Sequence, residues 1–167
     1  MLFEQSQQLR IHLMIPLVLS TDDDYSSQML MAAYLKDVNF CRSFVSKANG
    51  QEALDYLQNL TKDPSLANWP DIIFLDIKMP VLDGWGFLEG FTDLTQDLQK
   101  IPPVVLVSAT NTAGDISRAE AHPLVTALII KPISNTALKK LSSLPELCDY
   151  FSQEENSSAN PASTTVS

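Results

Sequence analysis

Apolar and polar positions along the chain form two kinds of block, and these blocks predict strands and helices in turn. Short runs of consecutive apolar residues are typical of buried parallel strands, because both faces of such a strand are covered. Runs in which apolar residues recur every three or four positions are typical of helices that bury one face. Runs of the first kind predict five strands, at residues 16–21, 40–46, 72–76, 102–109 and 125–130.

Helical spacing fills the segments between these strands. The helices that we expect span residues 26–37, 51–60, 87 to about 99, and 112–122, with a last one that begins after Ser134 or Asn135 and breaks or restarts at Pro145. Prolines and polar residues predict a loop at 61–70. Strands and helices that alternate in this way predict an α/β fold, in which a doubly wound, five-stranded parallel sheet carries helices on both faces.

Length and composition place one globular domain in the middle of the chain. The 167 residues suffice for a single core, and 45% of them are hydrophobic. We expect a domain at residues 14–151, preceded by an N-terminal extension at 1–13. Residues 152–167 are rich in Ser, Asn, Ala, Thr and Glu without an apolar face, which predicts a disordered tail.

Charge and cysteine usage exclude several classes of partner. A net charge of −9 argues against nucleic-acid binding, which needs clustered Lys and Arg. No apolar stretch is long enough to span a bilayer, so we expect no membrane partner. Cys41 and Cys148 form neither a metal-binding spacing nor a disulfide framework, which predicts a protein of the reducing cytoplasm.

Polar side chains follow four of the five predicted strands. The carboxyl ends of parallel strands meet at one edge of the sheet, where α/β proteins bind their ligands. The residues expected at this edge are Asp22-Asp23-Asp24 after the first strand, Asp76 after the third, Ser108-Ala109 after the fourth and Lys131-Pro132 after the fifth.

These residue types together suit phosphoryl transfer. Neighbouring carboxylates raise one another's pKa unless a cation neutralises them, and oxygen ligands without His or Cys favour Mg²⁺. An aspartate carboxylate can act as a nucleophile and form an aspartyl-phosphate, while a divalent ion and a lysine stabilise the transferring group. A serine hydroxyl can hydrogen-bond a phosphoryl oxygen. The sequence has no Gly-rich phosphate cradle, which argues against nucleotide binding.

Five segments together resemble the receiver domain of two-component response regulators, of the stand-alone type similar to chemotaxis regulators. The segments are the acidic run at 22–24, "NGQEA" at 49–53, "LDIKMPVLDGWGFL" at 75–88, "VVLVSA" at 104–109 and "IIKPI" at 129–133. The resemblance covers about residues 14–150. It implies a flavodoxin-like (βα)5 fold with the strand order 2-1-3-4-5.

The resemblance also implies which residues accept phosphate and hold the metal. Asp76 would accept a phosphoryl group from a phosphohistidine on a sensor histidine kinase or a histidine phosphotransfer protein. Mg²⁺ would be held by Asp76, the backbone carbonyl of Lys78 and two of the acids after the first strand. The register favours Asp22 and Asp23, and the pair Asp23 and Asp24 stays open. Asp24 is also a natural N-cap for the first helix.

The resemblance further implies a switch between two conformations. Ser108 would move toward the phosphoryl group, and Lys131 would pair with it. Movement of the loop at Ala109 and Thr110 would then change the face formed by the last two strands and helices, where a downstream protein binds. Lys78 and Thr110 occupy positions that, in the family, tune the lifetime of the phosphate. Leu128 stands where receivers usually carry an aromatic switch residue, which questions the aromatic part of the switch and not phosphorylation.

The expected function is therefore a phosphorylatable signalling protein, monomeric or weakly dimeric, and not an enzyme with an external substrate. One alternative is a receiver-like scaffold that binds partners without phosphorylation. Another is a Mg²⁺-dependent phosphohydrolase with Asp76 as nucleophile. Aspartate-based phosphatases of the haloacid dehalogenase type need a second Asp two residues further on, and Lys78 stands there.

Overall fold

A single parallel sheet forms the centre of the protein. The computed structural model describes residues 14–63, 69–96 and 98–151, so the expected extension at 1–13 and tail at 152–167 lie outside the described residues. The strands are β1 (Ile15–Thr21), β2 (Cys41–Lys47), β3 (Ile72–Asp76), β4 (Val104–Ser108) and β5 (Val125–Ile130). Their order across the sheet is β2-β1-β3-β4-β5, and every neighbouring pair is parallel. The predicted fold class and strand order are confirmed.

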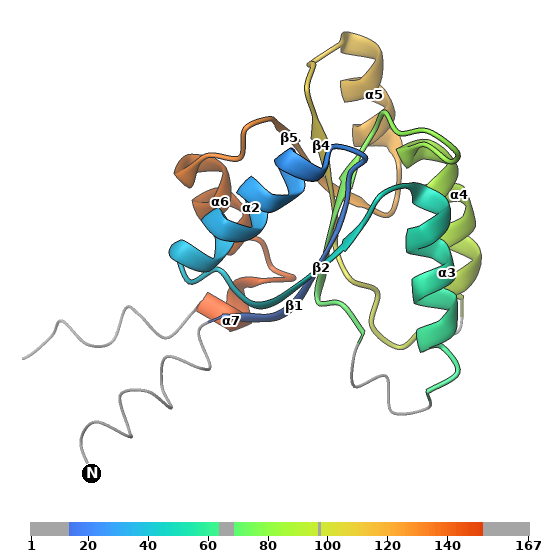
Figure 1. Ribbon diagram of the computed structural model, residues 1–167, viewed down its shortest axis with the longest axis horizontal. Coiled ribbons are helices and arrows are strands. Elements are labelled where there is room, and N and C mark those ends of the chain that lie inside the picture. The colour runs from blue at the N-terminus through green and yellow to red at the C-terminus, as the bar shows by residue number, and fades with distance from the viewer. Residues whose placement is uncertain (1–13, 64–68, 97, 152–167) are drawn as a thin grey trace, which may run out of the picture.

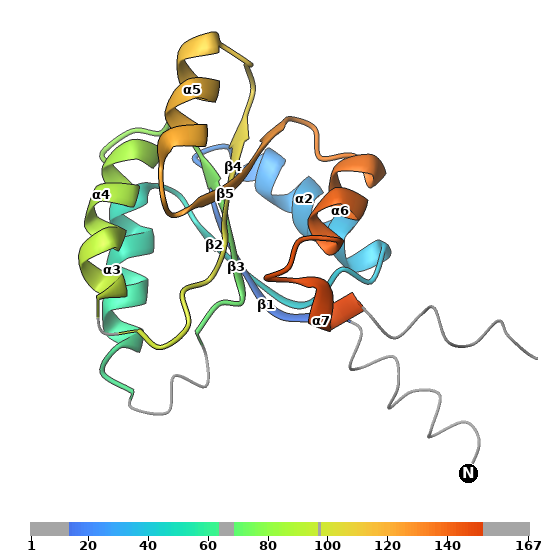
Figure 2. The same ribbon diagram turned by 180° about the vertical axis from the view of Figure 1, so that it is seen from behind.

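Helices cover both faces of the sheet (Figures 1 and 2). The described helices are α2 (Tyr25–Asp37), α3 (Gly50–Leu60), α4 (Gly84–Thr95), α5 (Ala113–Ala121), α6 (Asn135–Ser142) and α7 (Cys148–Phe151). Helices α2, α6 and α7 lie on one face, and α3, α4 and α5 lie on the other. None of the helices within the described ranges is long and apolar enough to cross a membrane.

The sheet divides the hydrophobic core into two clusters. Successive side chains of a strand point to opposite faces, so Ile72 and Phe74 of β3 pack toward α2 and α6, while Ile73 and Leu75 pack toward α3 and α4. Every residue of β3 and β4 is buried, as the unbroken apolar runs predicted. The central strands are therefore rigid supports for whatever their carboxyl ends carry.

Side-chain caps fix where the long helices begin. In each case a side-chain oxygen at the N-cap accepts a backbone N–H from the first turn, and these caps are Asp24, Asn49, Asp83, Thr112 and Ser134. Helix α6 is thus capped by Ser134, the first of the two residues expected to begin it. Helix α2 ends with Asn39 in the left-handed region (φ 54°), which lets Phe40 N–H bond the Leu35 carbonyl at 2.8 Å.

Two details differ from the sequence-based expectation. Helix α4 ends at Thr95, short of the expected Gln99. Leu30, part of the helical spacing expected at 26–37, is 73% exposed, because α2 turns Met31 and Leu35 toward the sheet instead.

Candidate phosphoacceptor site

The carboxyl ends of β1, β3 and β5 bring two acids and a lysine together. The Lys131 ammonium donates to Asp22 Oδ2 at 2.6 Å and lies 3.5 Å from Asp76 Oδ2. Asp22 and Asp76 are buried, and Lys131 is only partly exposed. One cation therefore lies between two buried carboxylates that would otherwise repel each other.

The three acids that follow β1 make different interactions. Asp24 Oδ1 accepts the backbone N–H groups of Ser26 and Ser27 at 2.9 and 3.2 Å, so this carboxylate caps α2. Asp22, Asp23 and Asp76 instead offer carboxylate oxygens that all lie within 4.8 Å of one another. An all-oxygen set of this kind fits Mg²⁺, and two buried acids with one lysine leave negative charge for a cation to neutralise.

Burial dominates the electrostatics of Asp76. Loss of solvent raises the pKa of its carboxyl, and the charge of Asp22 raises it further. The Lys131 ammonium and a hydrogen bond from the Ile77 backbone act in the opposite direction. The net result is a raised pKa, so the ionised form is costly in the folded protein until more positive charge reaches the site.

A glycine lets α4 start directly against the Asp76 loop. A Cβ on Gly84 would lie 2.5 Å from the Asp76 carbonyl oxygen, so no larger residue fits without moving the backbone. The Gly84 N–H donates to the Ile77 carbonyl at 2.9 Å, and the preceding Asp83 caps α4. Lys78 and Asp23 line the same shallow hollow beside this loop.

The other predicted residues lie around this centre at different depths. Ser108 is buried at the end of β4, where its Oγ accepts the Thr110 N–H at 3.1 Å and its carbonyl accepts the Lys131 N–H at 2.8 Å. Ala109 and Thr110 are exposed in the loop that follows. Leu128 lies apart from the acids, half-buried in a groove between β5 and α5.

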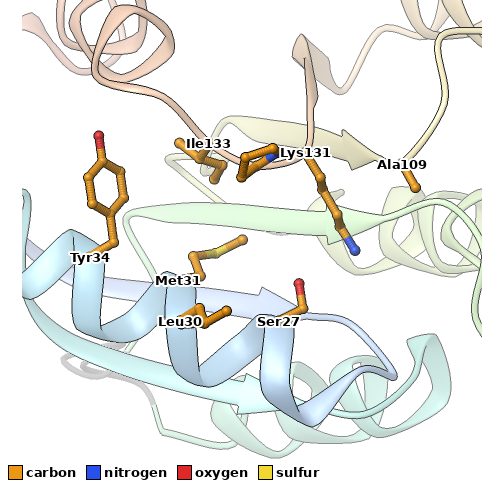
Figure 3. A pocket seen from close by; sticks show the side chains of 8 residues that line it. Ser27, Leu30, Met31, Tyr34, Ala109, Lys131 and Ile133 are labelled. Atoms are coloured by element: carbon orange, nitrogen blue, oxygen red, sulfur yellow. The ribbon is translucent and has the colours of Figure 1, made fainter.

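A pocket of about 560 Å³ opens beside Lys131 (Figure 3). Leu30, Met31 and Tyr34 of α2 form one wall, and Pro132 and Ile133 form the opposite wall. The hydroxyl of Tyr34 donates to Asn135 Oδ1 at 2.5 Å and so joins α2 to the start of α6. The pocket therefore continues the surface of the site onto α2.

One residue near the site went unrecognised in the sequence. Gln28 is buried under the acidic run, although a glutamine usually signals an exposed position. Its spacing from Met31 and Leu35, three and then four residues, was the available signal. Trp85 is buried at the start of α4 and carries the Arg118 guanidinium of α5 over its ring at 4.2 Å.

Comparison with known proteins agrees with this geometry. The sequence profile of the response regulator receiver domain matches residues 18–142. The chain belongs to the receiver domain family of two-component response regulators. Receiver domains of this family serve as phosphoacceptor modules in signalling and bind Mg²⁺ at an acidic pocket.

Curated relatives include short and long proteins. The "Probable methanogenesis regulatory protein FilR2" of Methanothrix harundinacea is 27% identical over 135 residues, which span 81% of this chain and 83% of that protein. A protein-glutamate methylesterase/protein-glutamine glutaminase of Chromobacterium violaceum is 33% identical over 89 residues. That match covers 52% of this chain but only 24% of the longer enzyme.

Solved receiver structures share the fold. A two-component response regulator from Cytophaga hutchinsonii superposes with a TM-score of 0.70 at 29% identity, over 76% of this chain and 93% of that chain. The receiver domain of the histidine kinase CKI1 from Arabidopsis thaliana, complexed with Mg²⁺ and BeF₃⁻, superposes with a TM-score of 0.66 at 21% identity. That match covers 77% of this chain and 91% of that chain.

Proposed function

We propose that this protein is a response regulator in which Asp76 accepts a phosphoryl group from a phosphohistidine, with Mg²⁺ held by Asp22, Asp23 and Asp76. The position of Lys131 carries the proposal, since its ammonium lies 2.6 Å from one buried carboxylate and 3.5 Å from another. The backbone carbonyl of Lys78 adds a fourth oxygen to the metal site. The solved Mg²⁺ complex of the CKI1 receiver domain supports this reading of the acidic cluster.

The chemistry is a displacement at phosphorus. A carboxylate oxygen of Asp76 forms the new bond, and the phosphorus–nitrogen bond of the donor breaks with its electron pair passing to the imidazole. Mg²⁺, held by Asp22, Asp23 and Asp76, would supply positive charge to the phosphoryl oxygens and lower the repulsion between them and the acids. Lys131 is the second cation, released from Asp22 to pair with the new phosphoryl group. The Ser108 hydroxyl, on the adjacent strand end, donates to a phosphoryl oxygen.

The first experiment measures the intact mass of the protein after incubation with Mg²⁺ and acetyl phosphate. We expect a single phosphoryl adduct that requires Mg²⁺, is lost at alkaline pH and is absent from Asp76→Asn. The control variant is Asp93→Asn, which removes an exposed acid of α4 and should leave the adduct unchanged.

The same experiment separates the alternatives. An unmodified wild-type protein, both with acetyl phosphate and with a panel of phosphorylated histidine kinases, would support a scaffold that works without phosphorylation. Continuous release of phosphate from many unrelated esters, without a lasting adduct, would support a phosphohydrolase. The exposed Lys78 in place of a general acid argues against that second outcome.

We further propose that the phosphodonor is a protein that docks on the apolar surface around the site. A donor histidine must reach Asp76, so the donor must cover the residues at this edge. Exposed apolar side chains lie on elements that border this edge, namely the first turns of α2, the loop after β3 and the end of β5, and these are Tyr25, Met29, Leu30, Val81 and Ile130. The pocket beside Lys131 lies within the same surface.

A charged substitution tests this docking surface. Leu30→Glu should slow transfer from a phosphorylated histidine kinase at least tenfold and leave phosphorylation by acetyl phosphate unchanged, because the small donor needs no docking. Val38→Glu, on an exposed apolar residue at the far end of α2, is the control. Equal transfer rates from the kinase to Leu30→Glu and to the wild type would contradict the proposal.

A further inference from the structure

The buried side chain of Gln28 hydrogen-bonds the backbone of the acidic run at 22–24. It lies in the first turns of α2, is 6% exposed, and its Nε2 donates to the carbonyls of Asp22 and Lys47, each at 2.7 Å. The Lys47 carbonyl also accepts the Asp22 N–H at 3.0 Å. The peptide groups on both sides of Asp22 are therefore fixed, one by the end of β2 and the other by the Gln28 amide.

This arrangement joins three elements at one point. Asp22 follows β1, Lys47 is the last residue of β2, and Gln28 belongs to α2. Among the described residues, no backbone N–H donates to the Asp22 carbonyl, so the Gln28 amide orients the peptide after Asp22. That peptide leads directly into Asp23, whose carboxylate belongs to the acidic cluster.

A primary amide such as that of Gln28 is suited to binding two backbone carbonyls. Two carbonyl oxygens need two N–H donors from one side chain, which a primary amide supplies and an apolar side chain or a carboxylate does not. The remaining atom, Gln28 Oε1, is buried and has no partner within the described ranges. A buried unpaired oxygen costs free energy, so a residue chosen only to fill the core would be apolar.

We propose that Gln28 is a positioning residue that sets the geometry of the Asp22–Asp23 pair for metal binding. The proposal rests on the function proposed for these acids. Gln28 touches neither the phosphoryl group nor the ion; it acts through the backbone that carries the ligands. Partners that orient metal ligands in this way are typically worth 10–100-fold in metal affinity.

Two substitutions and two controls test the role. Gln28→Met keeps the shape of the side chain and removes both donors, and Gln28→Glu keeps the shape and turns carboxylate oxygens toward two carbonyls. Gln51→Met and Gln51→Glu are the controls, because Gln51 is exposed on α3 and its amide donates to the side chain of Asp55. Mg²⁺ affinity is measured by calorimetric titration, and amide hydrogen exchange is measured on the metal-free protein.

We expect the Gln28 variants to bind Mg²⁺ 10–100-fold more weakly and the Gln51 variants to bind like the wild type. In metal-free Gln28→Met, the Asp22 amide should exchange at least tenfold faster while the core amides of Leu75 and Leu106 exchange as before. Unchanged Mg²⁺ affinity in Gln28→Met would overturn the proposal. A uniform loss of protection across β3 and β4 would also overturn it, because Gln28 would then support only global stability.

The exchange measurement keeps this proposal separate from the function proposed above. If wild-type protein bound no Mg²⁺ and formed no adduct, the phosphoacceptor function would fail, and with it the metal-binding role of Gln28. A local change in Asp22 exchange would then still show that Gln28 holds the loop. Unchanged exchange in a protein that does bind Mg²⁺ would reject the positioning role alone.

Discussion

At the scale of single residues, Val81 is the most unusual feature of the loop after Asp76. Its backbone has a positive φ (68°), and the Leu82 N–H closes a γ-turn on the Pro80 carbonyl at 2.8 Å, a rare and strained turn. A β-branched residue rarely adopts this conformation, which costs about 1–2 kcal/mol for an L-residue. The side chain is 82% exposed, so no burial offsets the cost. The turn is held by the Gly50 N–H, which donates to the Leu82 carbonyl at 2.9 Å.

Val81→Asn should therefore stabilise the protein. Asn adopts a positive φ more readily than a β-branched residue does, and Asn39 already has a positive φ in the turn after α2. We expect the free energy of unfolding, measured by urea denaturation, to rise by about 1 kcal/mol. Val38→Asn is the matched control, because Val38 is exposed but has an ordinary φ of −85°. A gain of equal size in both variants would show that surface polarity, and not backbone strain, is responsible.

The raised pKa of Asp76 predicts a pH-dependent effect of Asp76→Asn. Burial disfavours the ionised carboxylate, so the protein loses stability as the pH rises from below the ordinary Asp pKa through the raised folded value. In EDTA at pH 7, Asp76→Asn should unfold at a higher urea concentration than the wild type. The difference should shrink as the pH falls through the raised folded pKa of Asp76 toward the ordinary Asp value, because the wild-type carboxyl then gains its proton. A less stable variant at pH 7 would mean that pairing with Lys131 outweighs burial.

The acidic run illustrates what single residues could and could not reveal in the sequence. The residue types indicated a cation site, but the sequence left two pairs of acids open. The choice depends on where α2 begins, and only the hydrogen bonds of Asp24 to Ser26 and Ser27 show that this acid is the cap. Gln28 was missed because its residue type predicts exposure, while its burial follows from the rotation of α2 about its own axis.

At the scale of elements, the short helix α7 packs at the edge of the sheet where the strands begin. The Tyr150 hydroxyl donates to Asp71 Oδ1 at 2.6 Å, and Asp71 Oδ2 accepts the Leu17 N–H of β1 at 3.0 Å. The ring of Phe151 packs on that of Phe40 with centroids 5.5 Å apart. One carboxylate, at the residue before β3, thus joins the short helix to β1.

Tyr150→Phe should weaken this attachment. Hydrogen bonds to charged groups contribute about 1.5–3 kcal/mol, and we expect a loss near the lower end in the free energy of unfolding, because the site is partly exposed. Thermal and urea denaturation measure this loss of free energy of unfolding. Tyr25→Phe removes a hydroxyl from a residue that is 75% exposed and should have no effect. If both variants were as stable as the wild type, α7 would be held by its apolar contacts alone.

The elements themselves were largely predictable, and their ends were not. The runs at 72–75 in β3 and 104–107 in β4 are apolar throughout because both faces are covered, which the sequence shows directly. Helix α4 was expected to continue through Leu98, because apolar spacing continues there. Leu98 is half-buried although it lies beyond the end of the helix at Thr95. The apolar spacing at Leu98 therefore indicated a buried side chain and not a further helical turn.

At the scale of the whole molecule, the site exists only because the topology brings distant segments together. Asp22 and Lys131 are 109 residues apart in sequence and 2.6 Å apart in the fold. The alternation of strands and helices predicted this convergence, since all carboxyl ends of a parallel sheet meet at one edge. The distances within the site, and the depth at which each acid is buried, come from side-chain packing that no residue pattern specifies.

Mg²⁺ binding should therefore raise the free energy of unfolding of the whole domain. A ligand that binds only the folded state stabilises it by about 2.7 kcal/mol at a concentration one hundred times its Kd. We expect urea denaturation of the wild type to show such an increment between EDTA and excess Mg²⁺. Asp23→Asn should lose most of it, because Asp23 belongs to the acidic cluster. Asp24→Asn should keep it, because Asn caps helices as well as Asp does. Loss of the increment in both variants would assign the metal to Asp23 and Asp24. A loss confined to Asp24→Asn would contradict the proposed site.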